Sequence, residues 1–284
     1  MTRPEARKKY SLGMVYAYVA AGCVLLGIVL LFAMVLVFAF PALMEQETTG
    51  ILSWDWNPYQ GKFGILPMLA GSLMLSFSSL LVAYPLALGV SSFSVTTRSA
   101  LGRVLVHGVI RFMTAIPTVI YAFVGIVLLT PIIRNALGGS GLSWLTATLV
   151  LALLILPTIV LVLEAGLQPR LDSLCPGGLA IGLSRFELLW FFVFPQAKNT
   201  FVGAGLLGFG RAIGDTLIPL MLAGNAPLVA SGLSESLRTL TAHMAMVTAN
   251  EVGGAAYSSL FMAGAFLLAI NAVVSFASRR MLKA

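Results

Sequence analysis

Charge is scarce in this sequence. Charged residues make up 10% of its 284 residues and hydrophobic residues make up 59%, whereas soluble domains contain about 25% charged residues. The mean hydropathy is +0.98. These values exclude an ordinary soluble domain and indicate a protein that crosses a membrane several times.

Residues for metal and thiol chemistry are also few. The two cysteines, Cys23 and Cys175, form no CxxC pair and exclude a disulfide framework. The two histidines, His107 and His243, lie in no cluster with metal-ligand spacing. We recognise no Ser-His-Asp set, phosphate-binding glycine loop or Walker motif. We therefore expect no cofactor, no metal site, no catalytic residues and no ATPase within this chain.

The apolar residues gather in long runs. Crossing a bilayer takes about 20 apolar residues, and six runs are long enough: 15–40, 66–93, 110–133, 145–163, 201–222 and 257–276. The first run follows a basic segment that includes Arg3, but it is too long for a signal peptide core, so we expect it to be retained. The predicted fold is all-α, with about six transmembrane helices.

The basic residues predict the orientation of these spans. A net charge of +7 would also suit a nucleic-acid-binding protein, but the Lys and Arg residues lie at span ends and in short connections. If both termini are cytoplasmic, the outer side holds few of them, namely Lys62, Arg134 and Arg238. This bias predicts that both termini are cytoplasmic, and it makes a nucleic-acid partner unexpected.

Three connections are long enough to form structure. The inner connection, 164–200, contains Pro169, Pro176 and Pro195, and its composition predicts two short helices broken by turns. The outer loop after the first span contains Trp54 and Trp56, which suit either an interfacial belt or a turn that meets an outside partner. In the outer loop 223–256 we expect the polar residues to be mostly solvated, and these are Glu235, Arg238, His243 and Glu251.

One predicted span carries two opposite charges. Arg211 and Asp215 lie four residues apart in the segment Gly-Phe-Gly-Arg-Ala-Ile-Gly-Asp-Thr at 208–216. On a continuous helix this spacing puts both groups on one face. Each charge costs roughly 2.5–3.5 kcal/mol at the centre of a membrane helix. Two interpretations remain open: the residues line a path for an ion, or they form a structural ion pair that helps assembly.

The same segment resembles the permease subunits of the high-affinity phosphate ABC importers. Further resemblance lies in Trp-Asn-Pro at 56–58, Phe-Gly-Ile-Leu-Pro at 63–67, Ala-Ile-Pro-Thr-Val-Ile-Tyr at 115–121 and Gly-Asn at 224–225. It covers most of the chain from about residue 54 onward, and the first two of these motifs resemble the first of the two permeases. The resemblance divides the chain into a leading part, 1–53, and a permease core, 54–284, whose coupling region is 164–200.

This resemblance implies a type I ABC importer permease in a bacterial plasma (inner) membrane. The implied partners are a second permease subunit, two ATP-binding subunits, a periplasmic or extracellular phosphate-binding protein and membrane lipid. Arg211, Asp215 and Thr216 are the implied residues of the substrate path. Those implied for ATPase coupling are Gly182, Ser184, Arg185 and Pro195.

The chain departs from the family pattern at three positions. Asp215 stands where the family has Glu, and Arg111 stands where the family usually has a carboxylate. Pro176-Gly-Gly replaces the Glu-Ala start of the coupling motif and is expected to weaken the helix there. This last departure keeps open a degenerate permease that acts as a scaffold or a phosphate-sensing subunit. A permease for another oxyanion is a further alternative.

Overall fold

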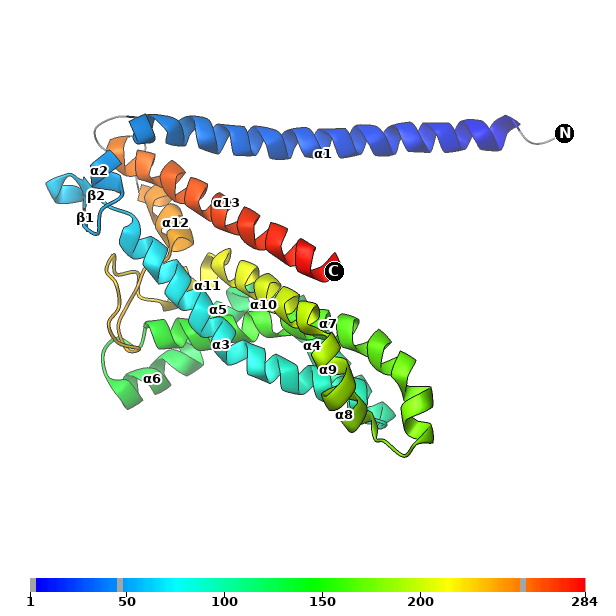
Figure 1. The fold of residues 1–284 in the computed structure, drawn as a ribbon. Coiled ribbons are helices and arrows are strands. Elements are labelled where there is room, and N and C mark those ends of the chain that lie inside the picture. Colours follow the sequence, from blue (N-terminus) through cyan, green and yellow to red (C-terminus); the bar gives the residue numbers. More distant parts are fainter. Residues whose placement is uncertain (1–3, 45–47, 251–253, 284) are drawn as a thin grey trace.

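The computed structural model describes residues 4–44, 48–250 and 254–283, and nearly all of its elements are helices (Figure 1). Its α-helices are α1 Pro4–Met44, α2 Thr48–Ile51, α3 Leu66–Thr96, α4 Ala100–Ala115, α5 Thr118–Val124, α6 Thr130–Leu137, α7 Trp144–Ala180, α8 Arg185–Glu187, α9 Phe194–Gln196, α10 Lys198–Ile213, α11 Leu217–Leu222, α12 Leu240–Asn250 and α13 Gly254–Lys283. The short 3-10 helix is η1 Pro58–Gln60, and the π-helices are η2 Gly125–Leu129 and η3 Leu188–Val193. The strands of the described part, β1 Trp56–Asn57 and β2 Lys62–Phe63, form one antiparallel hairpin. The all-α prediction is confirmed.

Five helical segments of the described part are long and apolar enough to cross a membrane. They are Gly13–Ala39, Leu66–Thr96, Thr118–Leu137, Trp144–Ala180 and Ser259–Met281. These segments overlap five of the six predicted spans. A polytopic membrane protein is therefore confirmed.

The sixth predicted span, 201–222, is not one continuous helix. α10 ends at Ile213 and α11 begins at Leu217, so the prediction of Arg211 and Asp215 on one helix face is wrong. Pro219 explains the break, because it has no N–H to donate to the carbonyl of Asp215 and its ring would collide with that carbonyl in a helix. Gly214, a poor helix former, lies within the break.

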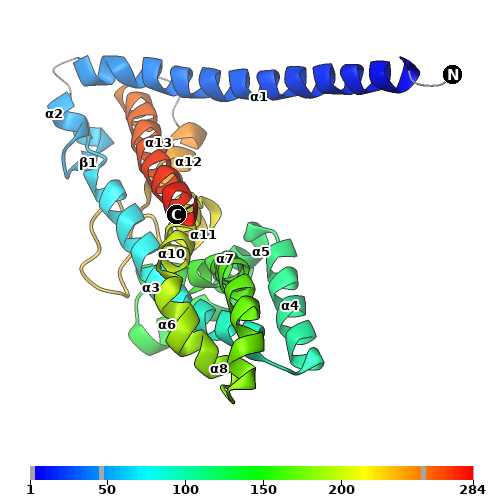
Figure 2. The same ribbon diagram turned by 45° about the vertical axis from the view of Figure 1, so that its right-hand side comes forward.

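The centre of the bundle is formed by α3, α7 and α10. α7 packs along both α3 and α10, and α13 packs on α10. α1 contacts α13 and lies at the edge of the bundle (Figures 1 and 2). The hairpin and α12 lie at one end of the molecule and α8 at the other, and the start of α1 and the end of α13 point away from the hairpin end (Figure 1). Arg3, which entered the prediction of orientation, lies outside the described residues.

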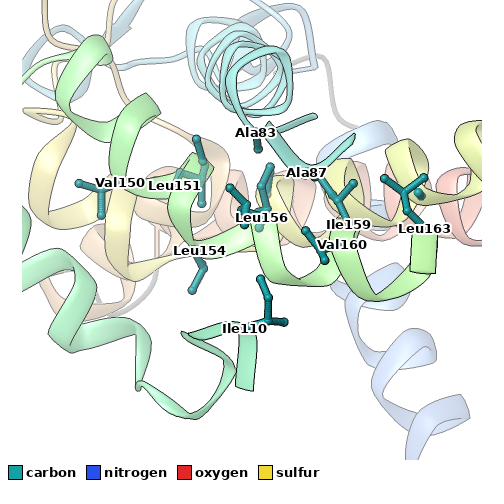
Figure 3. Packing of buried hydrophobic residues seen from close by; sticks show 14 of the residues in the cluster. Ala83, Ala87, Ile110, Val150, Leu151, Leu154, Leu156, Ile159, Val160 and Leu163 are labelled. Carbon is teal, nitrogen blue, oxygen red and sulfur yellow. The ribbon is translucent and has the colours of Figure 1, made fainter. Parts of the chain in front are cut away.

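The core follows one face of α7. Large side chains along this face are fully buried at intervals of four residues, namely Leu151, Ile155, Ile159, Leu163, Leu167 and Leu171. Ala83 and Ala87 of α3 are also fully buried and lie against this helix (Figure 3). Small residues let two helices approach closely, which matters in lipid because apolar burial gives little drive for association there.

The inner connection differs from its prediction. α7 continues without a break through Pro169 and Pro176 to Ala180, and one turn then leads to α8, η3 and α9, which follow one another directly. Both prolines are exposed, whereas Leu167, Leu171 and Cys175 on the other face are buried. Burial of that face keeps the segment helical although each proline removes a backbone hydrogen bond.

Substitution of Gly71 tests whether α3 packs closely against the outer loop at Arg238. A Cβ at this position would collide with the backbone carbonyl of Arg238. We expect Gly71→Ala to lower the free energy of unfolding by about 1–3 kcal/mol, the usual range for overpacking, seen as a lower thermal midpoint of the purified protein. Gly89→Ala in the same helix is the control, because no atom lies within 4 Å of its added Cβ. Equal midpoints for the two variants would contradict this packing.

Candidate functional site

Arg211 occupies the last turn of α10. Its side chain is exposed, and within the described ranges it forms no hydrogen bond and no ion pair within 4.0 Å. Asp215 is thus not its ion-pair partner in this conformation. An unpaired guanidinium at membrane depth is costly in contact with lipid, and such residues face a bundle interior or a wet cavity. We infer that the Arg211 face of this subunit does not face lipid.

Asp215 lies in the break between α10 and α11 and forms hydrogen bonds there through both its side chain and its backbone. Its carboxylate Oδ2 accepts a hydrogen bond from the N–H of Ile218 at 2.9 Å, in the first turn of α11. Its backbone carbonyl accepts a hydrogen bond from Thr241 Oγ1 at 2.8 Å. Asp is among the best residues at a helix start because its short side chain reaches the free N–H groups. Capping of α11 therefore gives a physical reason for Asp rather than the longer Glu at this position.

Thr216 and Tyr121 lie near the same break. Thr216 is half-buried, and its carbonyl accepts the first backbone bond of α11, from Leu220 N at 3.1 Å. Tyr121 of α5 is close enough to Arg211 for an electrostatic interaction. Its hydroxyl donates to the carbonyl of Met113 at 2.9 Å, which spans the proline break between α4 and α5. The structure thus brings the two broken spans together around Arg211.

The outer loop contributes residues to this region that the sequence analysis did not assign to it. Thr241 is buried, His243 is fully buried, and Arg238 is half-buried. The expectation that the polar residues of this loop are mostly solvated is wrong for His243 and Arg238, and Glu251 lies outside the described residues. A Thr-x-Thr sequence at 239–241, which starts α12, was the available signal, but its contact with Asp215 is set by tertiary structure.

The residues predicted for coupling build one compact turn after α7. Gly182 has φ of 88°, which favours glycine. Bonds from Gly182 N to Leu179 O at 3.1 Å and from Leu183 N to Gly178 O at 3.0 Å close the helix end in a Schellman motif. Arg185 pairs with Asp172 of α7 at 3.2 Å. Together these contacts hold this turn, residues 182–185, against the end of α7. We call it the coupling turn.

Ser184 begins the helix that follows this turn. Its hydroxyl and the carboxylate of Glu187 form a capping box. Hydrogen bonds from the side chain and the backbone N–H of Ser184 lower the pKa of Glu187 below its usual value. Pro195 lies in α9, which directly continues the π-helix η3.

An aromatic face continues from the capped helix start. It consists of the exposed side chains of Phe186, Trp190, Phe191 and Phe192. The rings of Phe186 and Trp190 stack at 6.1 Å. So much exposed aromatic surface on α8 and η3 marks a region that meets another protein or the membrane.

Comparison with known proteins identifies the class. Residues 83–283 match the family described as "Binding-protein-dependent transport system inner membrane component". The inward-facing MetNI methionine ABC transporter has a similar chain, with a TM-score of 0.60 and 16% identity, and the match covers 81% of this chain and 98% of that one. The fold is therefore that of a type I ABC importer permease, and the chain belongs to the binding-protein-dependent transport family.

Curated relatives narrow this class further. The "Probable ABC transporter permease protein YqgH" of Bacillus subtilis is 32% identical over 213 residues, which is 74% of this chain and 68% of the relative. The "Phosphate transport system permease protein PstC" of Pasteurella multocida is 30% identical over 248 residues, which is 79% and 76% of the two chains. PstC of Xylella fastidiosa is 28% identical over 264 residues, 85% of this chain and 80% of the relative. The resemblance to the first permease of phosphate importers is confirmed: the chain is a PstC-like permease.

Substitutions at Asp215 separate its capping role from its charge. Asn can accept the same hydrogen bond from Ile218 N through its amide oxygen, whereas Ala leaves this N–H without that partner, a loss of about 1–3 kcal/mol for a buried donor. We expect Asp215→Asn to keep the thermal midpoint of the purified protein and Asp215→Ala to lower it. A midpoint lowered equally by both substitutions would contradict capping as the structural role of this side chain.

Substitution of Ser184 tests whether the capping box stabilises the coupling turn. Removal of its hydroxyl in Ser184→Ala should cost about 0.5–2 kcal/mol of local stability and speed amide hydrogen exchange in α8, as measured by mass spectrometry. Ser173→Ala is the matched control, because that exposed hydroxyl only donates to the carbonyl of Arg170 within α7. Unchanged exchange in Ser184→Ala would show that the capping box does not hold the turn.

Proposed function

We propose that this chain is the transmembrane permease subunit of an ATP-driven importer that moves inorganic phosphate into the cytoplasm by alternating access. The observation that carries this proposal is Arg211, an exposed guanidinium without an ion pair in the described part, at the broken end of α10. The PstC relatives support phosphate as the substrate.

Guanidinium suits an oxyanion because it offers planar pairs of N–H donors and stays charged at every physiological pH. All donors of Arg211 are free for such a contact within the described residues. Asp215 uses Oδ2 to cap α11, which leaves Oδ1 to accept a hydrogen bond from the protonated oxygen of hydrogen phosphate. Sulfate lacks that hydrogen at neutral pH, so this acceptor offers one physical route to discrimination. Thr216, the third residue that we assign to the path, follows directly at the start of α11.

The break also suits a change of conformation. α10 and α11 are separate rigid pieces joined by three residues, 214–216, and few-residue connections of this kind absorb the dihedral changes of hinge motion. We propose that ATP binding and hydrolysis in the partner subunits move α10 relative to α11 and open Arg211 to one side of the membrane at a time.

The proposed assembly assigns one partner to each exposed surface. A second permease subunit covers the Arg211 face. Two ATP-binding subunits dock at the coupling turn with Gly182, Ser184, Arg185 and Pro195, next to the aromatic face. A periplasmic or extracellular phosphate-binding protein meets the opposite end, where Trp54 and Tyr59 of the hairpin region are exposed. In this arrangement the protein lies in a bacterial inner membrane with both termini in the cytoplasm, and it carries no ATPase itself.

Two other functions were considered for this chain. A permease for another oxyanion would use the same guanidinium, and the name of the Bacillus relative specifies no substrate. A degenerate scaffold or phosphate-sensing subunit was suggested by Pro176-Gly-Gly. However, α7 remains helical through this segment, and a Cβ at Gly178 would collide with the side chain of Leu188, so glycine permits close packing of the coupling turn. This packing favours a subunit that still couples to ATPases.

Phosphate uptake tests the role of Arg211. In cells that lack their own phosphate importer and express this chain with its partner subunits, we expect Arg211→Ala to reduce uptake of radiolabelled phosphate at least about tenfold, because charge-assisted hydrogen bonds are lost. Arg134→Ala, which removes an exposed arginine of α6, should leave uptake intact. If Arg211→Ala takes up phosphate as fast as the wild type, Arg211 is not part of the substrate path. If sulfate or molybdate competes with phosphate for uptake, another oxyanion is the substrate.

A further inference from the structure

Backbone hydrogen bonds hold the outer loop between α11 and α12 in place. Trp144 N donates to Glu235 O at 2.8 Å and Leu145 N to Leu233 O at 2.9 Å, which ties the loop to the start of α7. Leu237 N donates to Ala223 O at 2.9 Å, which closes the loop on itself after α11. The next residue, Arg238, is therefore held in a defined place by the backbone on both sides.

Arg238 is an incompletely satisfied cation in this fastened loop. Its Nε donates to the carbonyl of Asn225 at 2.9 Å, and its two Nη atoms donate no hydrogen bond to any residue that the structure describes. No carboxylate oxygen of the described chain lies within 4.0 Å of it. Burial lowers the pKa of the guanidinium, as expected for a charge that has lost water without gaining a counterion.

The neighbouring titratable group provides no counterion. His243 of α12 is fully buried, and its ring lies 4.4 Å from that of Trp56. Burial, together with the positive charge of Arg238, lowers the pKa of His243 to about 3. His243 is thus neutral at physiological pH, and it leaves the charge of Arg238 uncompensated. A half-buried cation without a counterion is unfavourable, and an anion from outside the described chain would compensate it.

Two hydrogen bonds connect the surroundings of Arg238 to the segment 215–225, which begins in the break after Arg211. Thr241, three residues after Arg238, donates to the carbonyl of Asp215 at 2.8 Å. Asn225, which receives the Nε bond, donates through Nδ2 to the carbonyl of Leu220 in α11 at 2.6 Å. Arg238 is therefore anchored to both ends of the segment 215–225, on the side of the outer loop.

Asn225 adds an acceptor next to the guanidinium. This residue has φ of 58°, in the left-handed region, which Asn tolerates better than most residues. Its buried Oδ1 has no hydrogen-bond partner in the described chain. This oxygen belongs to the residue whose carbonyl accepts the bond from Arg238 Nε. Donors of positive charge with one neutral acceptor match an oxyanion that keeps a proton.

We propose that Arg238 and Asn225 form a second oxyanion subsite, on the outer side of Arg211, that takes hydrogen phosphate before the ion reaches Arg211. The inference rests on the proposed function and extends it by one binding step. The Nη pair of Arg238 binds two phosphate oxygens, while Nε keeps its bond to Asn225. Because a second cation follows at Arg211, the anion moves between two positive sites and is held firmly by neither.

The experiment uses the complete importer in proteoliposomes: this chain, its partner permease, the ATP-binding subunits and the phosphate-binding protein. Radiolabelled phosphate uptake and ATP turnover are measured together for Arg238→Gln and Arg238→Lys, and the thermal midpoint of each purified complex is recorded. Arg134→Gln is the matched control. Like Arg238 it lies in the outer part, and its Nε donates to one backbone carbonyl, that of Ser140 at 3.0 Å, but it is exposed.

We expect Arg238→Gln to lower the phosphate moved per ATP roughly tenfold, because charge-assisted bonds to the anion are lost, while loaded binding protein still stimulates ATP turnover. Arg238→Lys, which keeps the positive charge, should retain most of the transport, and Arg134→Gln should match the wild type. Normal transport by Arg238→Gln would overturn the subsite. Equal losses in both Arg238 variants with a lowered thermal midpoint would also overturn it, because Arg238 would then only fasten Asn225.

The same assay separates this inference from the proposed function. If Arg211→Ala transports normally while Arg238→Gln does not, the proposed site at Arg211 fails and the outer subsite stands. If the wild-type complex moves sulfate or another unprotonated oxyanion instead of phosphate, the hydrogen phosphate subsite is overturned together with the proposed substrate. A folded wild-type complex that moves no oxyanion overturns both.

Discussion

Every backbone N–H and C=O group inside a membrane must find a partner within the protein, and the break between α10 and α11 shows how this chain meets that constraint. Pro219 cannot donate to the carbonyl of Asp215, so Thr241 donates to it instead. The Asp215 carboxylate satisfies the N–H of Ile218. These bonds fix the break that separates Arg211 from α11. One comes from Thr241, after the outer loop, and the other is made by the side chain of Asp215 within the break. The geometry of the candidate path depends on this small set of hydrogen bonds.

Few charges of the described part are paired. Two exposed pairs lie near the ends of the molecule, Lys62 with Asp55 at 3.0 Å and Arg185 with Asp172 at 3.2 Å. Pairs of this kind contribute little to stability in water. Arg211, which is exposed, and Arg238, which is half-buried, have no such partner in the described part. A transported anion is the partner that the proposed function assigns to these two cations.

Much of the architecture could be predicted from the sequence, because long apolar runs have few alternatives to a membrane helix. The break at 214–216 could also have been predicted from Pro219 and Gly214, but hydropathy alone hid it. The helical course of α7 through Pro176 could not, because it depends on Cys175 and Gly178 being buried against neighbouring segments. The burial of His243 depends on contact with Trp56, which lies 187 positions earlier in the chain. Local sequence carries no information about such distant packing.

α7 has a mechanical consequence. It is a single helix of 37 residues, about 55 Å long at the usual rise per residue. One end is bonded to the outer loop through Trp144 and Leu145, and the other end is clamped to the coupling turn through Asp172 and Arg185. α7 therefore connects the outer loop directly to the coupling turn through one continuous helix. In the proposed transport cycle, this continuous helix would carry a movement of the coupling turn to the outer loop on the opposite side.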